Sequence, residues 1–119
     1  EKQVWEIIER HQIRVHPAYY LGFGRVSCMF CIFGNADQWA TAAHLDPVRA
    51  NEISQYEKEF GVTIHRTRSV PNLIKRGKVY STYNEEYARD AMSFEYNKNI
   101  EMDNWYLPAG AYKRCGGPT

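Results

Sequence analysis

Residues 36–61, ADQWATAAHLDPVRANEISQYEKEFG, carry the clearest structural signals in this sequence. Residues 36–44 are rich in alanine, the amino acid with the highest intrinsic helix propensity. Asp46 then precedes Pro47, which is the usual order of an N-cap residue and a proline at the first helical position. Gly61 is a typical residue at the end of a helix. The stretch therefore predicts two consecutive helices that meet at Asp46, the second of them running up to Gly61.

The beginning of the chain has the pattern of an amphipathic helix. Val4, Ile7, Ile8 and His11 recur at three- and four-residue spacing, which places them on one helical face. Trp5 lies at the flank of that face. These positions predict one short helix before Pro17.

Two further helices are expected in the second half of the chain. Residues 70–76 predict a short helix that ends at Gly77. Asn84 is the expected N-cap of another helix of about a dozen residues, in which Tyr87 and Phe94 would share a face.

The segments between these helices have the composition of loops. Pro17 disfavours the helical conformation at His16, so that residue is expected in extended chain or a turn. Glycines punctuate residues 21–25, and the tail from Ile100 combines proline, glycine and aromatic residues. We therefore expect a mostly α-helical, small and loop-rich domain.

The composition limits the classes of protein to consider. The chain has 119 residues, 44% of them hydrophobic, which suits one globular domain over residues 1–119 and not a disordered segment. With 15 basic and 14 acidic residues, net charge alone predicts neither a nucleic-acid nor a membrane partner. We expect a cytoplasmic protein with no membrane partner, since no apolar run approaches about 18 residues and no signal-peptide pattern opens the chain. Glu1 stands directly before the amphipathic pattern, so we expect the C-terminal part of a longer polypeptide.

Cys28 and Cys31 form the first candidate for chemistry. Two residues between cysteines allow both thiolates to reach one metal ion or iron–sulfur cluster from a tight turn. Two alternatives remain: a pair of buried thiols beside Met29 and Phe30, or a redox pair of the thioredoxin type. The redox pair is normally found in a βαβ context that this sequence lacks.

A metal site needs further ligands. His44 follows Cys31 after twelve residues, as in some zinc fingers, but Val48 stands where the second histidine of that pattern would be. His16 and Cys115 are the other candidates. The sequence does not choose between these residues.

The second candidate is a segment of uniform charge. Residues 60–84 contain five basic residues and no acidic one, whereas the rest of the chain has 10 basic and 14 acidic residues. Arginine and lysine are suited to phosphate or sulfate, so we expect an anion-binding site there; the alternative is a solvated basic face. We call these five residues the basic segment: Arg66, Arg68, Lys75, Arg76 and Lys78.

Cys115 is the third candidate. It follows Arg114, whose positive charge favours the thiolate, and precedes Gly116 and Gly117, which would let a terminal segment swing over a site. The alternative is a tail thiol without a role.

The order of motifs over about residues 3 to 35 resembles the C-terminal part of the phosphoadenosine phosphosulfate (PAPS) reductase family, which is related to the adenine nucleotide alpha-hydrolase-like proteins. Members of this family combine a helix containing Val-Trp, a His-or-Asn/Pro turn, an aromatic residue, a Gly-aromatic pair and then two cysteines. The corresponding residues here are Val4-Trp5, His16-Pro17, Tyr19, Gly22-Phe23, and Cys28 with Cys31.

The resemblance implies a larger α/β enzyme and assigns roles to the cysteines. The family's phosphate loop, Ser-Gly-Gly-x-Asp-Ser, has no counterpart here, so an N-terminal nucleotide-binding domain would lie outside this chain. Cys28 and Cys31 resemble the second cysteine pair of the cluster-binding adenylylsulfate (APS) reductases. Cys115-Gly116 resembles the mobile Glu-Cys-Gly-Leu/Ile-His of the reductases, in which the cysteine attacks sulfur, although Arg114 replaces the glutamate and Gly117-Pro118 the rest.

Two functions are therefore expected. The first is the C-terminal domain of a PAPS-reductase-like oxidoreductase or sulfur transferase, inactive by itself. It would contribute the basic segment to an adenine nucleotide or sulfonucleotide site, with Cys115 as nucleophile, or with Cys28, Cys31 and Cys115 as ligands of an iron–sulfur cluster or zinc. Related enzymes that thiolate nucleic acids bind clusters through three cysteines. The second is a non-catalytic, metal-stabilised helical module that binds nucleic acid through the basic segment.

Overall fold

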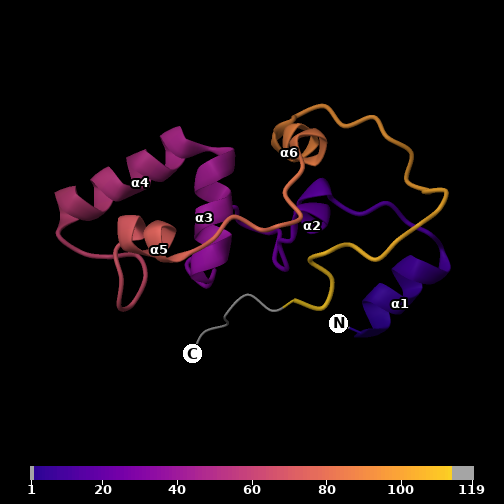
Figure 1. Ribbon diagram of the computed structural model, residues 1–119, viewed down its shortest axis with the longest axis horizontal. Helices are drawn as coiled ribbons and strands as arrows, with labels where there is room; N and C mark the ends of the chain where they lie inside the picture. Colours follow the sequence, from indigo (N-terminus) through magenta and orange to yellow (C-terminus); the bar gives the residue numbers. More distant parts are fainter. Residues whose placement is uncertain (1, 114–119) are drawn as a thin grey trace. The chain divides into compact units, whose positions relative to one another are not determined.

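The computed structural model describes residues 2–113 and is mostly α-helical (Figure 1). Six helices and no strand occur within that range, which confirms the expected fold class. The described chain forms two compact units. Unit 1 consists of residues 2–26 and 81–113, and unit 2 of residues 27–80.

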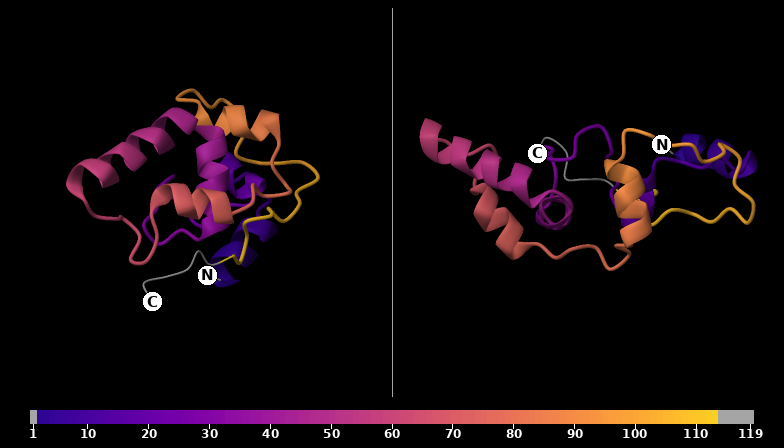
Figure 2. Two further views of the ribbon diagram at one scale, coloured as in Figure 1. Left: turned by 60° about the vertical axis from the view of Figure 1, so that its left-hand side comes forward. Right: turned by 90° about the horizontal axis from the view of Figure 1, so that it is seen from above.

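Unit 2 contains α3 (Ala36–Leu45), α4 (Pro47–Phe60) and α5 (Val70–Arg76). The predicted start and stop signals act as expected. The Asp46 side chain accepts a hydrogen bond from the amide of Arg49, and Gly61 ends α4 with a left-handed φ of 67°. Both α4 and α5 pack on α3 and contact each other, as Figures 1 and 2 show.

The core of unit 2 is built on a tryptophan. Trp39 of α3 is 1% exposed and packs with Val70 and Leu73 of α5. Phe30 packs against the same cluster, with its ring centroid 5.4 Å from that of Trp39. Ile53 of α4 adds to the cluster. The core therefore ties the segment before α3 to both later helices.

The end of α5 lies close against the beginning of α3. Gly77 follows α5, and a side chain at this position would overlap the carbonyl oxygen of Ala36. The next amide, that of Lys78, donates to the Asp37 carboxylate at 2.9 Å. The amide of Tyr80 then donates to the Thr41 hydroxyl at 3.0 Å. The segment after α5 therefore runs along the first turns of α3.

Unit 1 contains α1 (Lys2–Arg10), α2 (Pro17–Leu21) and α6 (Glu85–Met92). Tyr20 of α2 stacks on Tyr87 of α6 at 4.9 Å between ring centroids, and Tyr106 lies 5.3 Å away. The Tyr20 hydroxyl also donates to the sulfur of Met102 at 3.3 Å. Rings and a thioether from three segments thus form the packing between α2, α6 and the C-terminal segment.

Two features of unit 1 differ from the expectations: the face on which α1 packs, and the presence of the short helix α2. Within α1, Trp5 is 5% exposed, while Val4 and Ile7 of the expected apolar face are 58% and 48% exposed. The reason is a specific aromatic contact, since Trp5 meets Tyr19 edge to face at 5.2 Å. A large ring buries more apolar surface than a valine or isoleucine, so it determines which side of the helix packs. The short helix α2 was also not expected.

The last helix is shorter than expected. α6 has eight residues and ends before Ser93, whose backbone is extended at φ −83° and ψ 144°. Phe94 was expected on the same face as Tyr87, but it lies beyond the helix and is fully exposed. Because Phe94 is fully exposed, continuing the helix through it would bury no apolar surface to stabilise the extra turn. None of the helices in residues 2–113 combines the length and the hydropathy that crossing a lipid bilayer requires.

Replacing Gly77 by alanine should strongly destabilise unit 2. The φ of −83° at this position suits any residue, so the cost comes from contact with Ala36 and not from backbone conformation. We expect the free energy of unfolding to fall by about 1–3 kcal/mol, the usual cost of overpacking, as measured by urea denaturation. Lys78→Ala is the control: its side chain is exposed, so it should change stability by less than about 0.5 kcal/mol. Equal stability of the two variants would contradict the close approach.

His16 should make stability depend on pH. Its Nδ1 accepts a hydrogen bond from the Ala18 amide at 3.1 Å and caps α2, and partial burial lowers its pKa below the usual 6.5. The folded state therefore favours the neutral ring. Its contribution to stability is present above about pH 7 and is lost as the pH falls through about 6.5. His16→Asn keeps a capping acceptor that does not titrate, so its free energy of unfolding should decrease less between about pH 8 and pH 5.5. Identical pH profiles would contradict this role.

Candidate functional site

The cysteine pair and the basic segment belong to the same unit. Cys28, Cys31 and all five basic residues lie in residues 27–80, which form unit 2. Cys115, the expected nucleophile or third ligand, lies outside the described residues, so its predicted roles stay predictions.

The two cysteines have different environments. Cys28 is exposed, whereas Cys31 is 7% exposed, and both are free thiols. The sulfur of Cys31 accepts a hydrogen bond from the amide of Phe33 at 3.4 Å, and its carbonyl accepts from the amide of Gly34 at 2.9 Å. These bonds shape a turn that leads into α3. Cys31 is therefore held in place by the fold, while Cys28 is open to solvent.

The described residues supply only part of a metal site. Within residues 2–113, no group of three or more histidine, cysteine or acidic side chains is placed to hold a metal ion. Among the other candidates, His16 already uses Nδ1 to cap α2, and His44 lies exposed in the last turn of α3. A cluster or zinc would need Cys115 or ligands from elsewhere.

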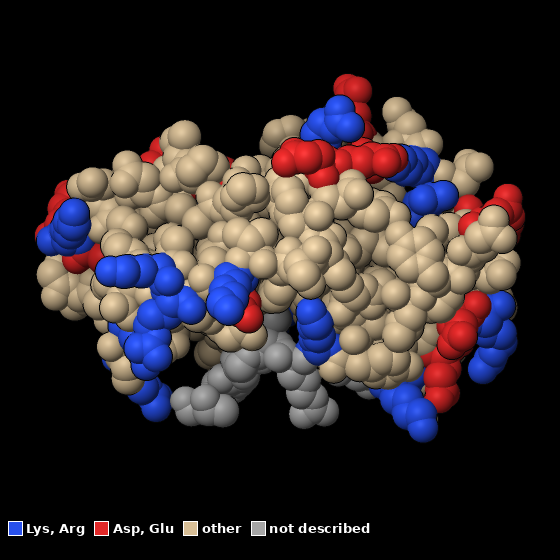
Figure 3. Space-filling model, viewed as in Figure 1, with Lys and Arg blue, Asp and Glu red and all other residues tan. Residues whose placement is uncertain are grey.

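The basic segment falls into two groups, one at each end of α5. Arg66 is exposed and Arg68 half-buried on the loop between α4 and α5, while Lys75, Arg76 and Lys78 are exposed at and just beyond the end of α5. A helix of seven residues separates the groups by about 10 Å. Figure 3 shows basic side chains gathered over α5 and the segment before it. The five residues of the basic segment are therefore divided between the two ends of α5.

The second group and the cysteine turn meet at the beginning of α3. The amide of Gly34 binds Cys31, and the next residue, Asn35, caps α3 by accepting from Gln38. On the other side, Lys78 binds Asp37 in the first turn of the same helix. The beginning of α3 therefore lies between the cysteine turn, which leads into it, and the backbone of Gly77 and Lys78, which is more than 40 positions later in the sequence.

The first group depends on a residue that the sequence did not single out. Glu57 of α4 is 8% exposed, and its Oε1 accepts from the amide of Val70 at 2.7 Å. Its Oε2 accepts from the amide of Ile64 at 2.9 Å. Glu57 stands in the charged run Tyr56-Glu57-Lys58-Glu59, which is typical of an exposed helical face, so no local signal marks it.

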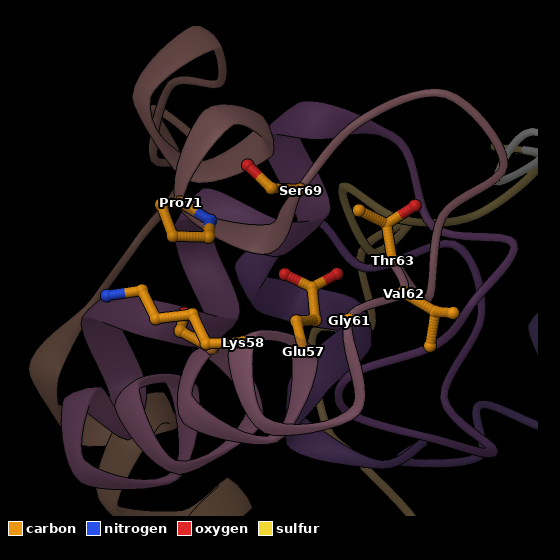
Figure 4. Close-up of a pocket in the computed structure, with 8 residues that line it drawn as sticks. Glu57, Lys58, Gly61, Val62, Thr63, Ser69 and Pro71 are labelled. Carbon is orange, nitrogen blue, oxygen red and sulfur yellow. The ribbon is translucent and has the colours of Figure 1, made fainter.

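A pocket of about 620 Å³ lies beside this carboxylate (Figure 4). In Figure 4 the Glu57 carboxylate points from α4 into the pocket, toward the side on which Ser69 and Thr63 lie. The pocket thus separates α4 from the loop that carries Arg66 and Arg68. Its lining comes from α4, the bend after it and the beginning of α5: Ser54, Glu57, Lys58, Gly61, Val62, Thr63, Ser69 and Pro71.

Comparisons with protein-family models, curated proteins and solved structures give no match for this chain. The resemblance to the PAPS reductase family therefore rests on the motif order in residues 3–35 alone.

The different environments of the two cysteines predict different reactivity. In a Cys115→Ser background, an aromatic disulfide reagent should react rapidly with Cys28 and at least about tenfold more slowly with Cys31, because the buried thiol must wait for local opening. The absorbance of the released thiolate measures both phases, and Cys28→Ser should abolish the fast one.

A shared metal ion would give a different result. Both thiols would then be protected equally, and a chelator would release them together. Equal rapid reaction of the two thiols without a chelator would contradict the burial of Cys31.

Proposed function

We propose that this chain forms part of a PAPS-reductase-like enzyme, in which unit 2 binds the anionic groups of an adenine sulfonucleotide beside the Cys28–Cys31 turn. The observation that carries the proposal is that the cysteine turn leads into the beginning of α3, against which the backbone of Gly77 and Lys78 from the second group packs. Sulfonucleotide reduction and sulfur transfer both need cysteine sulfur close to a bound phosphate or sulfate.

The second group of the basic segment suits such an anion. Lys75, Arg76 and Lys78 are exposed and so can reach a ligand. The guanidinium of arginine offers paired donors to two oxygens of a phosphate or sulfate, and lysine adds a point charge. Asp37, the carboxylate closest in this arrangement, already accepts from the Lys78 amide. The balance of charge at this place therefore favours an anion.

In this proposal the sulfur chemistry belongs to cysteines that the family resemblance assigns. Cys115 would be the attacking nucleophile or a ligand, together with Cys28 and Cys31, of a cluster or zinc. The nucleotide-binding domain of the family would hold the adenosine, and unit 2 would contact the phosphate and sulfate end. The chain alone would then bind weakly and catalyse nothing.

A second candidate is supported by the spacing of the two basic groups. The two groups lie toward opposite ends of α5, so their positive charges could follow a nucleic-acid backbone over more than one phosphate. Phe60 and Val62, exposed next to the first group, add apolar surface on which bases could stack or rest. A single-stranded nucleic acid would use both groups at once, whereas a mononucleotide needs only one.

Titration of the chain with adenylylsulfate tests the first candidate. The double variant Arg76→Ala/Lys78→Ala should weaken binding at least about tenfold, since each charge-assisted hydrogen bond contributes about 1.5–3 kcal/mol. Arg49→Ala is the matched control: it removes an exposed arginine of unit 2 outside the basic segment and should leave the affinity unchanged. Calorimetry measures all three proteins.

The same proteins distinguish the two candidates. Tighter binding of a single-stranded oligonucleotide than of adenylylsulfate, with a steep loss of affinity as salt rises, would favour the nucleic-acid module. In that case Arg66→Ala/Arg68→Ala should weaken binding as much as Arg76→Ala/Lys78→Ala. Binding of neither probe would overturn both candidates.

A further inference from the structure

We infer that Glu57 is a positioning residue that fixes the loop carrying Arg66 and Arg68 in the conformation that binds an anion. The inference rests on the second candidate of the proposed function, since only the nucleic-acid module uses Arg66 and Arg68 together with the second group. It adds to that site a buried carboxylate that none of the sequence motifs includes.

Apolar packing holds the end of the loop, where Val70 is fully buried, but contributes little at its beginning. Residues 61–64 are all exposed, and Val62 and Ile64 are 66% and 42% exposed despite their apolar side chains. The pocket of about 620 Å³ lies between this bend and α4 (Figure 4). A segment that spans a hollow has few apolar contacts to restrict it, so polar anchors must determine where it lies.

Glu57 provides such anchors on both sides of the arginines. Its two oxygens accept from the amide of Ile64, two residues before Arg66, and from the amide of Val70, two residues after Arg68. Both bonds are short, at 2.9 and 2.7 Å, and both join a carboxylate to backbone amides. Hydrogen bonds to an ionised acceptor are about twice as strong as neutral ones. One side chain thus binds the backbone at both ends of the five-residue span between Ile64 and Val70.

An electrostatic effect and a positioning effect of Glu57 predict opposite changes in the affinity for an anion. A carboxylate below a basic loop lowers the local positive potential, so removing its charge should strengthen anion binding if electrostatics alone mattered. If Glu57 acts by holding the loop, removing its hydrogen bonds should weaken binding, because the ligand must then order two arginine side chains and their backbone. The sign of the change therefore separates the two effects.

Glu57→Gln is the main test, with a single-stranded oligonucleotide as the probe and Glu59→Gln as the matched control. Both variants remove one negative charge from α4, but Glu59 is exposed and is not bound to the loop. We expect Glu57→Gln to weaken binding about tenfold and Glu59→Gln to leave it unchanged or slightly tighter. Tighter binding by both variants would overturn the inference.

Glu57→Asp keeps the charge but shortens the side chain by one methylene, so it cannot reach both amides. Weakened binding in this variant also supports positioning, whereas wild-type affinity would overturn it. The comparison of Glu57→Asp with the wild type tests the inference even if Glu57→Gln fails to fold. Amide hydrogen exchange at Ile64 and Val70 should accelerate in either variant, and unchanged protection of both amides would likewise overturn the inference.

A double-mutant cycle separates positioning from general destabilisation. If Glu57 acts through the loop, Arg66→Ala/Arg68→Ala should cost less affinity in the Glu57→Gln background than in the wild type. Full additivity would show that Glu57 supports only the stability of unit 2. If wild-type protein binds the oligonucleotide and depends on Arg66 and Arg68 but not on Glu57, only this inference fails. If wild-type protein does not bind the oligonucleotide, the nucleic-acid candidate fails and this inference with it.

Discussion

The burial of Trp39 against Val70 and Leu73 is the interaction on which unit 2 depends. A buried indole removes about 200 Å² of apolar surface from water, which corresponds to about 5 kcal/mol and exceeds the contribution of any single hydrogen bond in the unit. This contact pairs α3 with α5. The pairing places Gly77 against Ala36 and brings the backbone of Lys78 to Asp37 in the first turn of α3.

Polar side chains position the segments that the apolar core does not reach. Asp37 and Thr41 of α3 accept from the backbone after α5, and Glu57 of α4 accepts from the backbone before it. Each of these side chains binds an amide that no helix would otherwise satisfy. The helices of unit 2 are thus assembled by apolar contact, while the two basic groups are placed by hydrogen bonds from neighbouring helices.

The different environments of the two thiols bear on what the cysteine turn can do. Cys31 is held by the Phe33 amide and the core, whereas Cys28 is exposed. Two thiols in such different surroundings would differ in their availability to a metal or an oxidant. The pair is therefore better described as one anchored and one accessible sulfur than as two equivalent ligands.

The sequence by itself determined α1, α3, α4, α5 and the beginning of α6, because their signals are local. Asp46, Pro47, Gly61 and Asn84 act on amides within one turn of the chain, so their effects can be read without knowing the fold. Burial depended on the tertiary structure. Trp5, and not the regular apolar face beside it, packs because Tyr19 is there to meet it. Glu57 is buried because Ile64 and Val70 turn their amides toward it. Such partners are distant in sequence or joined through an irregular loop, and only the folded chain brings them within hydrogen-bonding or van der Waals distance.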